Sequence, residues 1–128
     1  MKTLLLSDQA ILQIGLQGAL ADLEHRVDLF RTSQIITAYT RVTSADQRPN
    51  LVMIDLGWCG LRSLKAVVQR IMGQISDVPL AILVNRPDEV SQVRLAGVEA
   101  DMFLAKTAAP AVMRQALARY MPAGATIS

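Results

Sequence analysis

The chain has 128 residues, of which 52% are hydrophobic, 19% charged and 4% aromatic, and its formal net charge is +2. This length and composition fit one domain with an aliphatic core, and they exclude two full domains and intrinsic disorder. A single cysteine and a single histidine exclude a disulfide framework and a Cys/His zinc site, and they fit a reducing cytoplasm.

The chain carries no signal for a membrane or for nucleic acid. No apolar run approaches the roughly 18 residues of a membrane span, and the first apolar run reaches Asp8 too soon for a signal peptide. The charges alternate in sign, with no basic block that would predict nucleic-acid binding. We therefore expect a cytoplasmic protein, with one domain over residues 1–121 and a flexible tail over residues 122–128.

Short apolar runs bounded by polar residues predict five strands, at residues 3–6, 27–30, 51–54, 80–84 and 102–105. Segments with helical spacing lie between and after them. The first has Leu12, Leu16, Leu20 and Leu23 at intervals of three or four residues, and the third has Leu61, Leu64, Val68 and Ile71. A second helix is expected around residues 33–42, against the preference of its β-branched residues for strands.

The last two helices have clearer boundaries. The fourth is expected to have Pro87 in its first turn, acidic residues beside its positive end, Val90 and Val93 facing inward, and Gly97 as its stop. The fifth is expected over residues 110–120, with one inward side formed by Val112, Met113, Ala116, Leu117 and Tyr120. This alternation predicts an α/β fold, in which a doubly wound parallel sheet has helices on both faces. The flavodoxin-like (βα)5 form has the strand order 2-1-3-4-5.

Polar residues follow four of the predicted strands: Ser7 and Asp8, Asp55, Asn85, and Lys106. In open α/β sheets ligands bind beyond the carboxyl ends of the strands, so these side chains should converge on one crevice. Carboxylates, an amide and an ammonium suit phosphate together with Mg²⁺, which prefers oxygen ligands. Strands usually end in polar residues, so each position alone has a purely structural explanation, whereas the four together favour a site.

Other sites are not indicated. The sequence has no glycine-rich dinucleotide or P-loop motif and no serine elbow. Gly57 and Gly60 are expected to form the loop after Asp55, and Cys59 to be a loop thiol without a nucleophile's activation. His25 is expected at the surface or at a sheet edge.

Over residues 2–121 the arrangement resembles the receiver domain of two-component response regulators. Asp55, in LVMIDLGWCGLRSL, stands where that family has its phospho-accepting aspartate, and Asp8 matches the second acidic residue after the first strand. Lys106 matches the lysine that ends the fifth strand, and Phe103 occupies the place of the switch aromatic. The stretch AGVEADMFLAKTAAPAVMRQAL looks most like receivers that carry a helix-turn-helix output domain.

The resemblance implies a phosphorylation switch in place of a conventional enzyme. Asp55 would accept a phosphoryl group from a histidine kinase, a phosphotransfer protein or a small phosphodonor. Mg²⁺ would bind Asp8, Asp55 and the carbonyl of Gly57, and Lys106 would pair with the phosphoryl group. Asn85 would sense that group, and the added charge would rearrange the face formed by the fourth helix, fifth strand and fifth helix.

Four positions depart from the family pattern. Ser7 replaces the first acidic residue, which predicts weaker Mg²⁺ binding, and Asn85 replaces a threonine or serine whose hydroxyl follows the phosphoryl group. Cys59 replaces a loop proline, and Glu99 stands where glycine is common. The departures at Ser7 and Asn85 keep open a second hypothesis, a receiver-like interaction module that works without phosphorylation.

A third hypothesis, a small enzyme on the same sheet, has no visible nucleophile–base pair to support it. The partners expected of a receiver are the phosphodonor protein and either an output domain or a separate target protein. A homodimer is a further option.

Overall fold

The structure, a computed structural model, describes residues 2–20, 26–44, 48–75 and 77–118. The elements in chain order are β1 (Lys2–Leu6), α1 (Ala10–Ala19), β2 (Arg26–Phe30), the short 3₁₀ helix η2 (Thr32–Gln34), α2 (Ile35–Thr43), β3 (Leu51–Asp55), α3 (Leu56–Met72), β4 (Leu80–Val84), α4 (Asp88–Leu95), β5 (Met102–Ala105) and α5 (Pro110–Ala118). All five predicted strands and all five predicted helices are present. Leu23, His25, Tyr120 and the expected tail lie outside the described residues.

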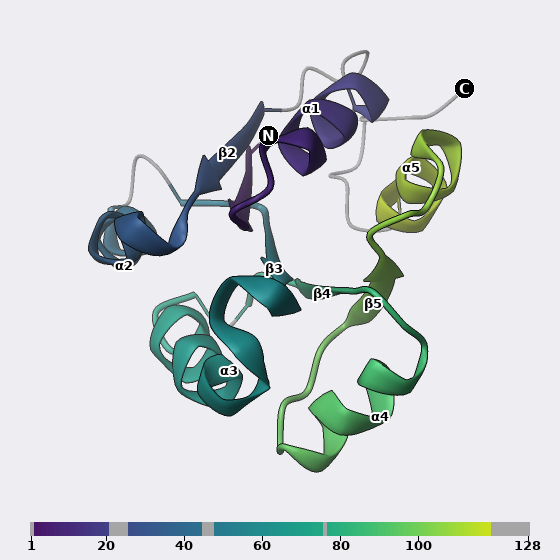
Figure 1. Ribbon diagram of the computed structural model, residues 1–128. Coiled ribbons are helices and arrows are strands. Elements are labelled where there is room, and N and C mark those ends of the chain that lie inside the picture. Colours follow the sequence, from purple (N-terminus) through teal and green to yellow (C-terminus); the bar gives the residue numbers. More distant parts are fainter. Residues whose placement is uncertain (1, 21–25, 45–47, 76, 119–128) are drawn as a thin grey trace.

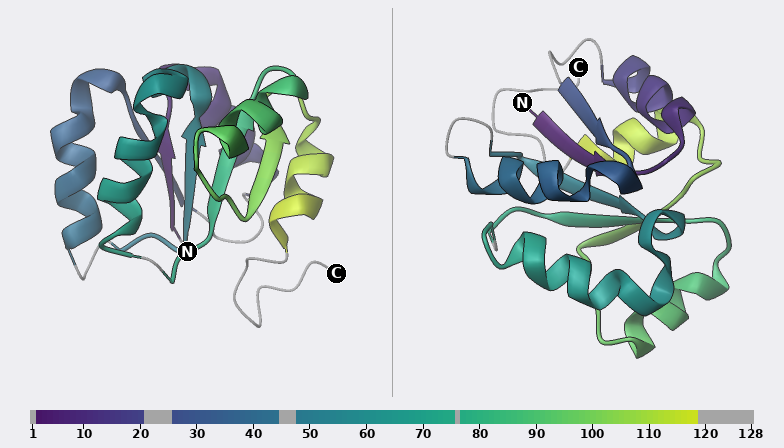
Figure 2. Two further views of the ribbon diagram at one scale, coloured as in Figure 1. Left: turned by 90° about the horizontal axis from the view of Figure 1, so that it is seen from below. Right: turned by 60° about the vertical axis from the view of Figure 1, so that its left-hand side comes forward.

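The sheet is parallel throughout and has the order β2-β1-β3-β4-β5, as predicted for a flavodoxin-like fold. Figure 1 shows α1 and α5 on one face of this sheet and α2, α3 and α4 on the other. The two views in Figure 2 show the same three layers from other directions. Strand order reverses between β1 and β3, so the carboxyl ends of these two strands border the crevice in which ligands of such folds bind.

Burial along each strand follows its place in the sheet. Every residue of the central strands β3 and β4 is buried, because helices cover both faces. The outer strands β2 and β5 are only partly buried. On β2, the backbone N–H of Val27 donates to Gln17 Oε1 at 2.9 Å, and its carbonyl accepts from Gln13 Nε2 at 3.0 Å. The helix α1 thus occupies hydrogen-bonding groups on the outer strand, which limits edge-to-edge pairing with other chains.

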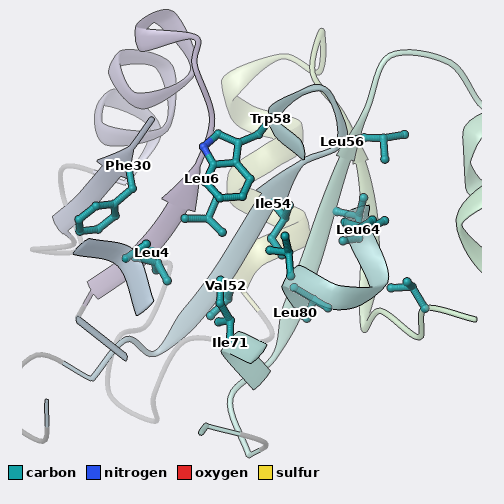
Figure 3. Packing of buried hydrophobic residues seen from close by; sticks show 14 of the residues in the cluster. Leu4, Leu6, Phe30, Val52, Ile54, Leu56, Trp58, Leu64, Ile71 and Leu80 are labelled. Carbon is teal, nitrogen blue, oxygen red and sulfur yellow. The ribbon is translucent and has the colours of Figure 1, made fainter. Parts of the chain in front are cut away.

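Two apolar cores hold the layers together. The larger core lies between the sheet and helices α2, α3 and α4, and Figure 3 shows part of it, from Leu4 and Phe30 to Leu64 and Leu80. The smaller core joins the other face of the sheet to Leu12 and Leu16 of α1 and to Met113 and Leu117 of α5. Burying each such side chain contributes about 1.5–3 kcal/mol to folding.

The structure corrects two expectations about helices. The segment with Gly57 is not a loop, because α3 begins at Leu56, directly after β3, where the carboxylate of Asp55 caps it by accepting from the Gly57 N–H. The helix is interrupted only at Gly60, whose φ is 75°. Val112 does not face inward but is 54% exposed, because the buried side of α5 is set by Met113 and Leu117.

The structure also refines the fourth helix. Pro87 lies just before the first turn of α4, since that helix begins at Asp88. Gly97 ends the segment with a φ of 85°, as its position in the sequence suggested. Within the described ranges, the longest helices remain too short or too polar to cross a bilayer.

Candidate functional site

Asp55 lies at the centre of the site. It is the last residue of β3 and is only 2% exposed, with buried apolar residues before it in the strand. A carboxylate buried to this degree needs a nearby cation and hydrogen-bond donors to offset the loss of hydration. The surrounding strand ends supply both.

Lys106, directly after β5, supplies the cation. Its ammonium forms an ion pair with Asp55 Oδ1, and the two side chains are 8% and 3% exposed. The same oxygen accepts from the Gly57 N–H at 3.0 Å. A Cβ added to Gly57 would lie 3.3 Å from Lys106 Nζ and 3.4 Å from Asp55 Oδ1, so a larger residue would crowd the ion pair.

Ser7 engages the other oxygen of Asp55. Its hydroxyl, at the carboxyl end of β1, donates to Asp55 Oδ2 at 2.8 Å and accepts from the Gln9 N–H at 3.0 Å. Ser7 is fully buried. Both carboxylate oxygens are therefore engaged by the protein itself. The sequence placed Ser7 at the strand end but gave no sign that it bonds directly to Asp55.

The oxygen donors at this end of the sheet are of the kind that Mg²⁺ prefers, but few of them are charged. Asp8 is exposed and directly follows Ser7, and Gly57 follows Asp55 by two residues, so both residues belong to this end of the sheet. Mg²⁺ is commonly held by one or two carboxylates and keeps several waters, so this donor set suits it. Among the residues the structure describes, no three His, Cys, Asp or Glu side chains gather as a metal cluster.

Asn85 lies outside this group. Asn85 is exposed, and its backbone N–H donates to Glu89 Oε1 at 2.6 Å. The Arg86 N–H donates to the same oxygen at 2.8 Å. Glu89 therefore organises the turn from β4 into α4, while within the described ranges the side chain of Asn85 forms no hydrogen bond to Asp55 or Lys106.

Phe103, the expected switch aromatic, is half-buried on β5. The guanidinium of Arg94, from α4, lies 5.4 Å from the centroid of the Phe103 ring, at a cation–π distance. Both residues line a cavity of about 510 Å³ together with Gly97, Val98, Glu99 and Ala100. The ring thus packs between β5 and α4.

Cys59 lies in the first turn of α3. This position corrects the expectation from the sequence that it is a loop thiol. Burial raises the pKa of this thiol to about 11. The thiol is therefore protonated at neutral pH, which agrees with the expectation that it is no nucleophile.

Comparison with known proteins rests on three-dimensional structure. No protein-family profile matches the sequence, and no curated protein sequence matches it. A CheY-like protein, tadZ, from Pseudomonas aeruginosa superposes with a TM-score of 0.74 at 16% identity, covering 100% of this chain and 98% of that one. The chain has a CheY-like receiver fold.

Two further solved receiver domains also superpose on this chain. A response regulator from Thermotoga maritima has a TM-score of 0.72 at 17% identity, covering 93% of this chain and 95% of that one. The receiver domain of a sensor histidine kinase from Pseudomonas aeruginosa, with a magnesium ion coordinated in its active-site cleft, has a TM-score of 0.68 at 20% identity and the same coverages. These likenesses show the receiver fold and leave the helix-turn-helix output subgroup a prediction.

Proposed function

We propose that this chain is a receiver domain that accepts a phosphoryl group on Asp55 and thereby changes its contacts with a target. The observation that carries the proposal is the buried Asp55–Lys106 ion pair, formed by residues 51 positions apart at the carboxyl ends of two strands. A buried charge pair is a costly way to stabilise a fold, because desolvation offsets most of the attraction. A chemical role explains its presence better.

In the proposed reaction, an oxygen of Asp55 attacks the phosphorus of a phosphohistidine or a small phosphodonor. The new P–O bond forms as the P–N or P–O bond to the leaving group breaks in line; a leaving imidazole takes up a proton from water, whereas a leaving carboxylate needs none. Lys106 remains beside the acyl phosphate and offsets its charge, while the Gly57 N–H donates to it. Ser7 must release Asp55 Oδ2 if that oxygen is the one that reacts.

Asp8, Asp55 and the Gly57 carbonyl would hold Mg²⁺, which when bound supplies further neutralisation of the phosphoryl oxygens. The proposed partners are a histidine kinase or phosphotransfer protein, and an output domain or target protein. Asn85 and Phe103 are the proposed switch residues, acting through the turn into α4 and through the Arg94–Phe103 contact.

One observation favours a second function, a receiver-like interaction module that works without phosphorylation. Asp55 is 2% exposed, and its two oxygens already have three partners in Lys106, Gly57 and Ser7. A carboxylate satisfied in this way is a poorer nucleophile than a free one, because attack costs it hydrogen bonds.

Intact-mass measurement after incubation with acetyl phosphate and Mg²⁺ separates the two functions. The proposal predicts a gain of one phosphoryl group in the wild type and in Asp88→Asn, a matched change of an exposed aspartate on α4. Asp55→Asn should gain none. A wild-type chain that is folded but never labelled would contradict the proposal and favour the second function.

A further inference from the structure

Arg31 directly follows β2 and is bonded to the loop that borders Asp55. Its Nη1 donates to the backbone carbonyl of Asp8 at 2.9 Å. Asp8 in turn follows Ser7, whose hydroxyl donates to Asp55 Oδ2 at 2.8 Å. The Ser7 N–H donates to the carbonyl of Phe30, the last residue of β2, at 3.1 Å. Two hydrogen bonds therefore tie the end of β2 to the end of β1, and one of them brings a positive charge to the loop that carries Ser7.

The guanidinium of Arg31 has N–H groups left for an anion. The residue is exposed, and in the described part of the chain its side chain forms a single hydrogen bond and no ion pair. Two other arginines next to strands each have a carboxylate partner: Arg26 pairs with Asp28 at 2.9 Å, and Arg86 pairs with Asp88 at 3.1 Å. A guanidinium carries five N–H donors in a planar fork that matches the oxygens of a phosphoryl group. Arg31 therefore keeps both charge and donors for a ligand.

The charges at the carboxyl ends of the strands balance without a metal ion. Asp8 lies just after β1 and Asp55 ends β3, whereas Arg31 and Lys106 directly follow β2 and β5. Ser7 is neutral where the receiver pattern has a carboxylate. A dication therefore finds no net negative charge in this set. Phosphorylation replaces the single charge of Asp55 by about −1.5 to −2, which two cations can offset.

We infer that Arg31 binds the phosphoryl group together with Lys106, so that Asp55 is phosphorylated without a divalent metal. This inference rests on the proposed function, since it assigns a further residue to the same site. Binding requires rotation of the Arg31 side chain, which exchanges the neutral Asp8 carbonyl for a phosphoryl oxygen. The exchange is favourable because a hydrogen bond between two charged groups is the stronger one. Mg²⁺, when bound, adds to this neutralisation but is not required for it.

This role predicts opposite effects of Arg31 on the two ligands of the site. Loss of its positive charge weakens the binding of the phosphoryl group and strengthens the binding of Mg²⁺. A purely structural role, in which Arg31 only holds the loop of residues 7–9, predicts that both are weakened, because both ligands need that loop in place. The sign of the change in Mg²⁺ affinity therefore separates the two roles.

Intact-mass measurement after incubation with acetyl phosphate, in EDTA or in Mg²⁺, tests the effect on the phosphoryl group. The wild type should gain one phosphoryl group in both conditions. Arg31→Gln should be labelled about tenfold more slowly in EDTA, as expected for the loss of one charge-assisted hydrogen bond, and Mg²⁺ should restore its rate. Arg31→Lys keeps the charge and should recover much of the rate in EDTA. Arg26→Gln, a matched change at the start of β2, should behave as the wild type does.

Titration of Trp58 fluorescence with Mg²⁺ tests the effect on the metal without any phosphorylation. Arg31→Gln should bind Mg²⁺ several-fold more tightly than the wild type, whereas Arg31→Lys and Arg26→Gln should match the wild type. Labelling of the wild type only in Mg²⁺, or an unchanged or lower Mg²⁺ affinity in Arg31→Gln, overturns the inference and leaves the proposed function standing. A folded wild type that is labelled in neither condition contradicts the proposed function, and the inference with it.

Discussion

Asp55 and Ser7 show how single residues set the chemistry of the site. The hydroxyl of Ser7 donates to Asp55 Oδ2 at 2.8 Å, where the receiver pattern has a second carboxylate. A neutral donor stabilises the buried Asp55 carboxylate in the absence of metal, whereas a carboxylate in the same place would repel it. We therefore expect the serine to favour a metal-free site and to lower the affinity for Mg²⁺.

Ser7→Asp should reverse this balance. Without divalent metal, the variant should lose about 2–4 kcal/mol of unfolding free energy, because two buried carboxylates then face each other. Mg²⁺ should bind it more tightly than it binds the wild type and should restore much of the loss.

Titration of Trp58 fluorescence measures the affinity, since Trp58 is buried beside Gly57 in the first turn of α3. Denaturant unfolding with and without Mg²⁺ measures the stability. Ser7→Asn, which keeps a neutral donor, is the control and should show no gain in affinity. Equal Mg²⁺ affinities for the wild type and Ser7→Asp would show that residue 7 does not limit metal binding.

Cys59 permits a prediction about pH. Burial raises its pKa from an ordinary value of 9.0 to about 11, so at pH 8 the folded protein should hold about 100-fold less thiolate than an unfolded chain. Alkylation by iodoacetamide should be slower by a similar factor in the native state and should reach the ordinary rate in denaturant.

The same shift has a consequence for stability. Between pH 9 and 11 the unfolded thiol loses its proton while the folded thiol keeps it, so the free energy of unfolding falls as the pH rises through this range. Cys59→Ser removes the titrating group and should make this part of the pH dependence disappear. Equal alkylation rates in native and unfolded chains would contradict the buried position of the thiol.

At the scale of elements, the segment from β4 through α4 to β5 links the site to the surface. Glu89 holds the backbone N–H groups of Asn85 and Arg86, and Arg94 stacks on Phe103 of β5. A switch in this segment must move these contacts when Asp55 is modified. The exposed side chain of Asn85 has no bond that ties it to Asp55, so we expect weak coupling in the wild type.

Asn85→Thr should strengthen that coupling, because a short hydroxyl can follow the phosphoryl group inward and leave room for Phe103. The measurement is the change in amide chemical shifts of residues 87–118 when beryllofluoride is added. The variant should show larger changes than the wild type, and Thr107→Val, at an exposed position after β5, is a control that should not. A wild-type response as large as that of Asn85→Thr would contradict weak coupling.

For the whole molecule, the topology could be predicted from the sequence because its signals are redundant. The continuous apolar runs of β3 and β4 are typical of strands buried on both faces, and the helices between them require parallel crossovers. The approach of Asp55 to Lys106 then follows from the strand order alone. No side-chain detail was needed for either prediction.

The details that could not be predicted depend on tertiary contacts. Gly57 suggests a loop by propensity, but the Asp55 carboxylate caps a helix there and overrides that preference. Val112 is as apolar as its buried neighbour Met113, and only the packing of α5 on α1 and the sheet decides which one faces inward. The bond from Ser7 to Asp55 depends on the position of a buried hydroxyl, for which spacing gives no signal.

Chemical trapping tests most directly whether Asp55 carries the phosphoryl group. After incubation with acetyl phosphate and Mg²⁺, borohydride reduction converts an aspartyl phosphate to homoserine, whose position tandem mass spectrometry of the digested chain can locate. We predict homoserine at position 55 and at no other aspartate. Homoserine at position 8 or elsewhere, or none in a folded chain, would show that Asp55 is not the phosphoryl acceptor.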